Sequence, residues 1–165
     1  MIRFVKETDA EQLADLMNHV ELSGFMLVDP NERNVSAQEI KALIQRADNE
    51  VLVSENERLD GYVIIQKNKL NRIRHRASLV MGVHEAARGK GVGTALLTTV
   101  ERWAEEQHIS RLELGVMATN VSALHVYEKC GFVIEGIRRN ALFVDGAYCD
   151  ELYMGKTIES FRFCK

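Results

Sequence analysis

Proline and cysteine are scarce in this chain, which has one proline and three cysteines in 165 residues. Because there is also no low-complexity linker, nothing in the sequence marks a domain boundary. We expect residues 1–165 to form one domain with enough chain to bury a single core. The cysteines are scattered and odd in number, namely Cys130, Cys149 and Cys164, which indicates reduced thiols and not a disulfide framework. No cysteine or histidine pairing argues for a metal, so we expect none.

Excess charge and long apolar runs are missing too. The net charge is −3, so there is no overall positive field that would attract nucleic acid or an anionic membrane. No run approaches the length of a transmembrane helix, and residues 1–12 lack the apolar segment of a signal peptide. Hydrophobic residues make up 46% and charged residues 27%, which is ordinary for a soluble globular protein. We therefore expect a cytoplasmic protein that binds neither nucleic acid nor membrane.

The chain is organised around residues 78–103, where a strand-like run leads through a glycine-rich loop into a helical pattern. Residues 79–83 are apolar, and beyond the loop the apolar residues recur at helical spacing. Between them stands R-G-K-G-V-G, residues 88–93. Alternate glycines let the backbone approach a ligand, and the start of a helix offers free N–H groups at the positive end of its dipole. This pattern predicts a phosphate site, with Arg88 and Lys90 as added cations; the alternative is a tight turn that needs glycine only for its geometry.

Two common glycine-loop motifs do not fit this segment. A P-loop fails because Ala87 stands five positions after Gly82, where a second glycine is required. A dinucleotide fingerprint fails because Thr94 and Leu96 stand where its third glycine belongs. What remains is R-x-x-G-x-G, residues 88–93. This motif resembles the pyrophosphate loop of the GCN5-related N-acetyltransferases, the GNAT family, which bind acetyl-coenzyme A.

A second segment resembles the same family. Residues 112–116 alternate like a strand, and Asn120 can cap a following helix that ends at Gly131. Family members carry an asparagine, an alanine three residues on, and a tyrosine before a Gly-Phe ending, which here are Asn120, Ala123, Tyr127, Gly131 and Phe132. The two segments stand in the family's order. The strand-helix-strand arrangement also predicts that strands 79–83 and 112–116 lie parallel.

The remaining segments read as shorter elements. We expect a strand at 2–5, followed by a helix that begins with a capping box at Thr8 and Glu11. A second helix at about 37–47 begins with a capping box at Ser36 and Glu39. Two hairpins are expected, one of strands 51–53 and 61–65 and one of strands 138–144 and 148–156, the latter with its turn at Asp145 and Gly146. Residues 23–34 hold an apolar cluster, which we interpret as a loop folded onto the core, with a substrate lid as the alternative. The basic connection 67–76 is interpreted as a solvated loop, with a binding patch as the alternative.

The resemblance implies an α/β (α+β) fold of the GNAT type, in which a mixed, mostly antiparallel sheet is flanked by helices. It further implies that the two parallel strands are splayed to admit the cofactor. The implied function is an acetyl-CoA-dependent N-acetyltransferase acting on the primary amine of a small molecule or amino acid, since residues 144–151 are similar to that branch. A protein N-terminal or lysine acetyltransferase, and a CoA-binding sensor without turnover, stay open as alternatives. A homodimer is common in the family.

The resemblance also implies roles for individual residues. The loop that would hold the pyrophosphate comprises Arg88, Gly89, Lys90, Gly91, Val92, Gly93 and Thr94. The backbone at Val83 would contact the thioester carbonyl, and Asn120 would lie near the pantetheine amides. Tyr127 would protonate the leaving sulfur, because a phenol is a donor at neutral pH; the alternative is an ordinary helix aromatic packed on the sheet.

The general base stays open. Many relatives carry a glutamate in the strand before the loop, but residues 75–83 contain no carboxylate. The other candidates are Glu85, Glu113, Asp150, Glu151, His84 and His125. A route through water, or an amine that is already neutral, is an equal alternative.

Overall fold

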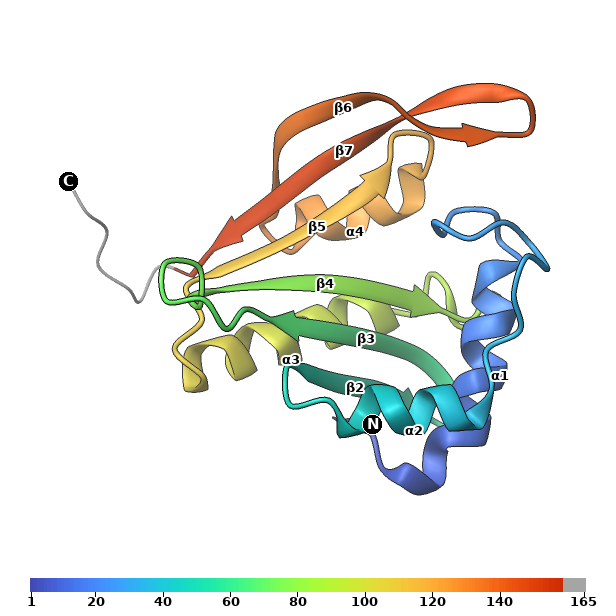
Figure 1. Ribbon diagram of the computed structural model, residues 1–165, viewed down its shortest axis with the longest axis vertical. Helices are drawn as coiled ribbons and strands as arrows, with labels where there is room; N and C mark the ends of the chain where they lie inside the picture. The colour runs from blue at the N-terminus through green and yellow to red at the C-terminus, as the bar shows by residue number, and fades with distance from the viewer. Residues whose placement is uncertain (159–165) are drawn as a thin grey trace.

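The computed structural model describes residues 1–158, so Cys164 lies outside the described residues. Within them, seven strands form one sheet in the order β1-β2-β3-β4-β5-β7-β6 (Figure 1). The strands are β1 (Ile2–Phe4), β2 (Asn49–Glu55), β3 (Leu59–Lys67), β4 (Arg76–Val83), β5 (Arg111–Met117), β6 (Val133–Val144) and β7 (Ala147–Thr157). The helices are α1 (Ala10–Glu21), α2 (Ala37–Gln45), α3 (Val92–Glu106) and α4 (Val121–Lys129), with short 3-10 turns η1 (Glu7–Asp9) and η2 (Glu85–Ala87). The expected mixed, mostly antiparallel sheet flanked by helices is confirmed.

The sheet opens between β4 and β5, its one parallel pair within residues 1–158. These strands pair only through Arg76–Ser78 against Arg111–Glu113. By contrast, β3 pairs with β4, and β5 with β7, along seven residues each. Both strands continue beyond their short shared stretch, so they diverge, as Figure 1 shows. The predicted parallel arrangement is confirmed, and the divergence leaves a gap in the middle of the sheet.

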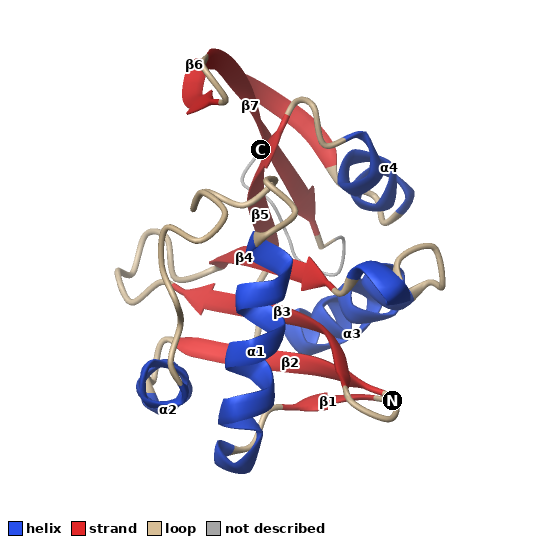
Figure 2. Cartoon of the chain, turned by 90° about the vertical axis from the view of Figure 1, so that its right-hand side faces the viewer, coloured by secondary structure: helices blue, strands red, loops and turns tan. Residues whose placement is uncertain are grey.

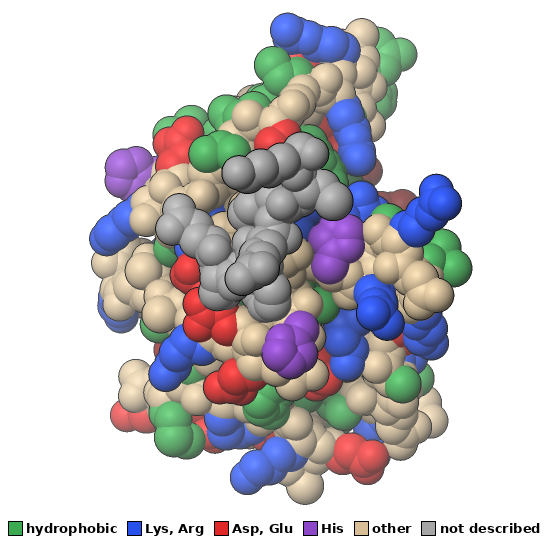
Figure 3. Space-filling model, turned by 90° about the vertical axis from the view of Figure 1, so that its left-hand side faces the viewer, with side chains coloured by type: hydrophobic (Ala, Val, Ile, Leu, Met, Phe, Trp, Pro, Cys, Tyr) green, Lys and Arg blue, Asp and Glu red, His purple; other side chains and the backbone are tan. Residues whose placement is uncertain are grey.

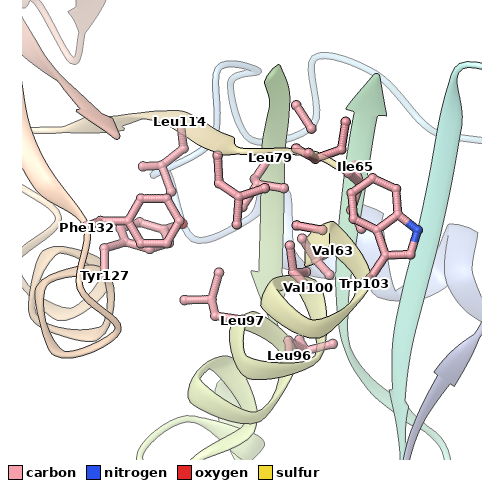
Figure 4. Packing of buried hydrophobic residues seen from close by; sticks show 14 of the residues in the cluster. Val63, Ile65, Leu79, Leu96, Leu97, Val100, Trp103, Leu114, Tyr127 and Phe132 are labelled. Atoms are coloured by element: carbon pink, nitrogen blue, oxygen red, sulfur yellow. The ribbon is translucent and has the colours of Figure 1, made fainter. Parts of the chain in front are cut away.

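Each face of the sheet carries its own hydrophobic core. Within β2, Val51 and Val53 pack in the cluster formed with α1 and α2, whereas Leu52 packs in the cluster formed with α3, as strand alternation requires. Figure 2 shows α1 and α2 on one side of β2 and β3, with α3 on the other. On the α3 side the core includes Val63, Ile65, Leu79, Leu96, Val100 and Trp103 (Figure 4). The two helical layers therefore flank the gap from opposite faces.

The start of α1 differs from the prediction. The expected capping box at Thr8 and Glu11 is wrong, because the chain passes through η1 and the helix begins after Asp9. The Asp9 carboxylate accepts the Lys6 backbone N–H at 2.7 Å and an Arg3 guanidinium N–H at 2.7 Å. A charged acceptor held by an arginine binds a free backbone N–H more strongly than the Thr8 hydroxyl can, so the entry into the helix is set by Asp9.

Three other local predictions, a helix start, a helix end and a hairpin turn, are confirmed. Ser36 and Glu39 form a complete capping box at the start of α2. Gly131 follows α4 with a φ of +84°, the left-handed stop that glycine permits. Asp145 and Gly146 both have positive φ, at +50° and +81°, as a type I′ hairpin turn requires. The strand before this turn, β6, begins at residue 133 and not at 138.

The basic connection between β3 and β4 is neutralised in part by nearby carboxylates. Lys67 pairs with Glu50 at 2.9 Å, and Arg76 lies 3.8 Å from Glu113. Figure 3 shows this end of the molecule, where lysine and arginine side chains are interspersed with acidic ones. This arrangement agrees with the interpretation of residues 67–76 as a solvated connection.

Candidate active site

A cavity of about 530 Å³ lies where β4 and β5 separate. Residues 79–83 of β4 and 115–117 of β5 line its middle. One side is lined by the glycine loop and by the starts of α3 and α4, the other by Val20 of α1 and by the chain that follows α1. Because α1 and α3 cover opposite faces of the sheet, the cavity reaches both faces through the gap.

The glycine loop adopts a left-handed backbone at two positions. Gly89 has a φ of +74°, and Gly91, the N-cap of α3, has a φ of +82°. A Cβ built on either residue would meet nothing within 4 Å. Glycine is therefore needed at these positions for the left-handed backbone conformation, and not to avoid a clash with other parts of the protein. The N–H groups of residues 92–94 belong to the first turn of α3 and have no partner in the helix itself. The loop therefore combines the geometry of a tight turn, open space beside Gly89 and Gly91, and N–H groups without helical partners, which fits an anion such as a phosphate.

The two loop cations are placed differently. Arg88 lines the cavity, and its Nε donates to the Val83 carbonyl oxygen at 3.3 Å. This contact ties the loop to the end of β4, where Val83 also lines the cavity. Lys90 is exposed and is not among the lining residues. Arg88 is thus the loop cation that the structure brings to the cavity.

Asn120 and Tyr127 approach the cavity from α4. The Asn120 side-chain oxygen accepts the Ala123 N–H at 3.2 Å and caps the helix, which leaves the amide NH₂ as the group that can face a ligand. The Tyr127 ring is buried and packs edge-on against Phe132, with centroids 5.9 Å apart (Figure 4). Burial raises the pKa of the Tyr127 phenol to about 12, so it keeps its proton at neutral pH. Both residues line the cavity, and both also have a structural role.

Comparison with known proteins decides the family of this fold and site. The sequence model of the Acetyltransferase (GNAT) family matches residues 15–132. The chain belongs to the GNAT acetyltransferase family. The expectation of an N-acetyltransferase enzyme is thereby confirmed.

Two curated relatives illustrate the range of this GNAT family. The L-amino acid N-acetyltransferase AaaT of Escherichia coli is 29% identical over 126 residues, which cover 76% of this chain and 73% of AaaT. The spermidine N(1)-acetyltransferase of Vibrio cholerae is 25% identical over 154 residues, which cover 90% of this chain and 87% of that protein.

Solved GNAT structures share the fold along almost the whole chain. An acetyltransferase of the GNAT family from Streptococcus pneumoniae superimposes with a TM-score of 0.86 at 28% identity, over 96% of this chain and 98% of the other. A putative acetyltransferase from Salmonella typhimurium, solved with acetyl-CoA, gives 0.86 at 22% identity over 98% and 95%; at that identity the likeness concerns the fold. Within residues 1–158 of this GNAT chain, none of the helices has the length and apolar character needed to cross a membrane.

The segment after α1 forms the other wall of the GNAT cavity. Phe25, Met26 and Leu27 line it, and Met26 also packs against the core of α1 and α2. Leu27 is 77% exposed. The base of the segment is held by the buried Glu21, which accepts two hydrogen bonds from Arg33, at 2.5 and 3.0 Å. Residues 23–34 are therefore anchored to the core as predicted, yet they also present apolar side chains to the cavity.

The two histidine candidates for the base occupy different places. The His84 ring stacks on His19 with centroids 4.1 Å apart, and its Nδ1 accepts the Ala86 N–H at 3.2 Å. His84 lines a second cavity, beside α1, and is not among the residues of the first one. His125 of α4 does line the first cavity, on the side of the glycine loop. The structure thus separates His84 from the candidate site.

The four carboxylate candidates are also separated. Three are engaged elsewhere: Glu85 is exposed beside His19, Glu113 is bound to Arg111 at 3.0 Å, and Asp150 is bound to Arg139 at 2.7 Å. Glu151 lines the cavity. Strand alternation placed Glu113 correctly, opposite Leu112 and Leu114, but did not distinguish Glu151, because its position depends on how β7 pairs with β5.

Proposed function

We propose that this GNAT chain transfers the acetyl group of acetyl-CoA to the primary amine of a small molecule or amino acid. The observation that carries this proposal is the cavity that reaches both faces of the sheet between β4 and β5. A thioester donor and an amine acceptor can then enter from opposite faces and meet in the gap. When both substrates are held in the gap in the right orientation, the bimolecular reaction becomes effectively unimolecular.

On the donor side, we assign the pyrophosphate to the N–H groups and glycines of residues 88–94, with Arg88 as the cation at the cavity. The open space at Gly89 and Gly91 supports this assignment, since a Cβ there would meet only the ligand. The backbone at Val83 would donate to the thioester carbonyl, where negative charge develops during attack. The Asn120 amide would contact the pantetheine arm.

Tyr127 is our candidate for the acid that protonates the departing sulfur. Its phenol keeps its proton at neutral pH because burial raises its pKa to about 12. A thiolate that leaves into a buried site gains from a nearby donor. The neutral amine attacks the thioester carbonyl carbon, the C–N bond forms, the C–S bond breaks, and the sulfur takes the phenolic proton. The nitrogen loses one N–H proton in the same reaction, and this proton balances the one that Tyr127 has given up.

Calorimetric titration of the purified protein with acetyl-CoA tests the donor side, with ATP and NAD as controls. We expect saturable binding of acetyl-CoA alone. Absence of binding by protein that is shown to be folded would refute the assignment of the loop. Release of CoA thiol in the presence of an amine then tests the transfer, and a panel of free amines, amino acids and peptides separates small-molecule from protein acceptors. A protein that binds acetyl-CoA but releases no thiol with any acceptor would be the CoA sensor.

A further inference from the structure

Glu151 stands out among the residues around the cavity. It is the one carboxylate among the described residues that line this cavity. Its side chain is only 14% exposed, although it belongs to the C-terminal hairpin, most of whose other strand, β6, is exposed. A carboxylate that is largely shielded from solvent and faces the cavity of an N-acetyltransferase calls for an explanation, because withdrawing a charge from water is costly unless a partner compensates it.

Strand pairing explains how Glu151 enters the cavity. In β7 it lies opposite Met117 of β5, and the carboxylate leans over Gly115. A Cβ built on Gly115 would lie 2.9 Å from Glu151 Cδ and closer still to Oε1. The missing side chain at Gly115 therefore makes the room that the carboxylate occupies. Gly115 lines the same cavity, so Oε1 is at the cavity wall.

The face of the sheet on which Glu151 lies is fixed by alternation along β5. Leu114 and Val116 point into the core beneath α3 and α4, so the position of a Gly115 side chain is on the opposite face. That is the face of α1 and of residues 23–34, the side that we assign to the acceptor. Tyr127 lines the cavity from α4, on the other face. A carboxylate and a phenol thus border one gap from its two sides.

The remaining oxygen of Glu151 is held by Arg138. The Arg138 Nη1 donates to Glu151 Oε2 at 2.9 Å, and the guanidinium lies over the Tyr153 ring at 5.4 Å from its centroid. Both contacts fix the orientation of the carboxylate: one oxygen is bound to Arg138, and the other is directed over Gly115. An amine in the cavity can therefore meet Oε1 without breaking the ion pair.

We propose that Glu151 binds the ammonium group of the acceptor and accepts its proton as the amine attacks, an inference that rests on the proposed transferase function. A carboxylate and an ammonium form a strong, charge-assisted hydrogen bond. Val20, Phe25 and Leu27 supply apolar walls on this side, so the fitting substrate class is a primary amine on an apolar body. The surplus proton of the ammonium first leaves to solvent, which gives the nitrogen a lone pair. In the step itself, the C–N bond forms, the C–S bond breaks, one N–H proton passes to Glu151, and Tyr127 protonates the sulfur. Exchange with solvent then returns a proton to Tyr127 and removes the one on Glu151.

The test compares E151Q with a matched control, D150N. Asp150 is the neighbouring carboxylate, and it binds Arg139 and the Asn140 N–H away from the cavity. For each variant, the acetyl-CoA Kd is measured by calorimetry and kcat/KM is measured with two acceptors. One acceptor is a primary alkylamine, which is protonated at neutral pH, and the other is a weakly basic amine such as an alkoxyamine, which is largely neutral there.

We expect E151Q to keep the acetyl-CoA Kd and to lose about 10²–10⁴-fold in kcat/KM with the alkylamine, the usual contribution of a general base. The loss should shrink with the weakly basic amine, which is already neutral and has no ammonium proton to lose before it attacks, and a purely structural glutamate would not produce that difference. E151D should recover part of the activity with the alkylamine, and D150N should match the wild type.

Two outcomes would overturn the inference: an E151Q protein with wild-type kcat/KM for the alkylamine, or equal losses with both amines. If E151Q does not fold, the same comparison is made with E151D, whose shorter side chain withdraws the carboxylate from Gly115. Failure of the proposed function looks different, because the wild-type protein itself would then transfer acetyl to neither amine.

Discussion

Replacing Gly115 by alanine should displace the Glu151 carboxylate without removing it. The added Cβ would lie 2.9 Å from Glu151 Cδ and 3.5 Å from Cγ, and the first separation is too short for two carbons that are not bonded. The atoms in its way belong to the end of a flexible side chain, so a rotation of Glu151 relieves the overlap. That rotation moves the carboxylate off the cavity wall and away from Arg138.

The cost in stability should be small. Losing the partly exposed pair of Glu151 and Arg138 costs about 0.2–1 kcal/mol, and a strained rotamer of Glu151 costs about 0.5–1.5 kcal/mol. Alanine in place of glycine within a strand returns about 0.5–1 kcal/mol. The net change in the free energy of unfolding is therefore between almost nothing and a loss of about 2 kcal/mol, and a loss of 1 kcal/mol lowers Tm by roughly 2–4 °C at this chain length.

The cost in activity should be much larger. A catalytic group displaced by about 1 Å can cost about 10²-fold in rate, so kcat/KM of G115A with an alkylamine should fall toward that of E151Q while the acetyl-CoA Kd is kept. Urea unfolding and the thiol-release assay measure the two quantities. G136A is the matched control, because a Cβ at Gly136 meets nothing within 4 Å. Wild-type transfer by G115A would refute the reasoning, and so would a loss of stability well above 2 kcal/mol, since the overlap would then not be relieved by the side chain.

Three further predictions concern other parts of the chain. Y127F should lose about 10²–10⁴-fold in kcat with the acetyl-CoA Kd kept, because the ring still packs but the proton donor is gone; stopped assays and calorimetry check this, and an unchanged kcat excludes Tyr127 as the acid. G91V should lower the free energy of unfolding by about 1–2 kcal/mol, the cost of a left-handed non-glycine residue, and should weaken acetyl-CoA binding, whereas a loop that is only a turn would leave the Kd of the folded variant unchanged. The hydrogen bond from Arg3 lowers the pKa of the Asp9 carboxyl in the folded protein, and the Lys6 N–H adds to this effect. The ionised Asp9 carboxylate therefore stabilises the fold at pH values above its unfolded pKa of about 3.9, and this stabilisation is lost as the pH falls through the lower folded pKa. D9N should remove that part of the acid dependence in urea titrations between about pH 2 and 6; an unaltered acid dependence would contradict it.

The elements that the sequence predicted well are those whose signals are local. The glycines of residues 88–93, the Asn120 cap and the Asp145–Gly146 turn each impose a backbone conformation through two to four neighbouring residues. Helix α1 shows the limit of such signals. Its start depends on the ion pair of Arg3 with Asp9, which links β1 to η1, and a capping pattern within residues 8–11 does not contain that information.

The candidate base could not be predicted for a related reason. Glu151 reaches the cavity only because β7 pairs with β5 in one register, which sets the carboxylate over Gly115. A slip by one residue would turn Glu151 to the other face and bring Asp150 into its place. The sequence contained a usable hint, a glycine in the middle of an apolar strand, because such a glycine marks a close approach by another group.

The divergence of β4 and β5 has a further physical consequence. Strands that separate leave backbone N–H and C=O groups along their facing edges, and groups of this kind need partners when water is excluded. In residues 79–83 and 115–117 those edges border the cavity. The pantetheine arm that we place there contains amides, so it can satisfy the edge of β4 as an added strand would. The gap that lets an amine reach Glu151 on one face therefore also supplies the donors that align the thioester from the other. A substitution that closed the gap would be expected to lower acetyl-CoA affinity and transfer together, whereas a change at Glu151 should affect transfer alone.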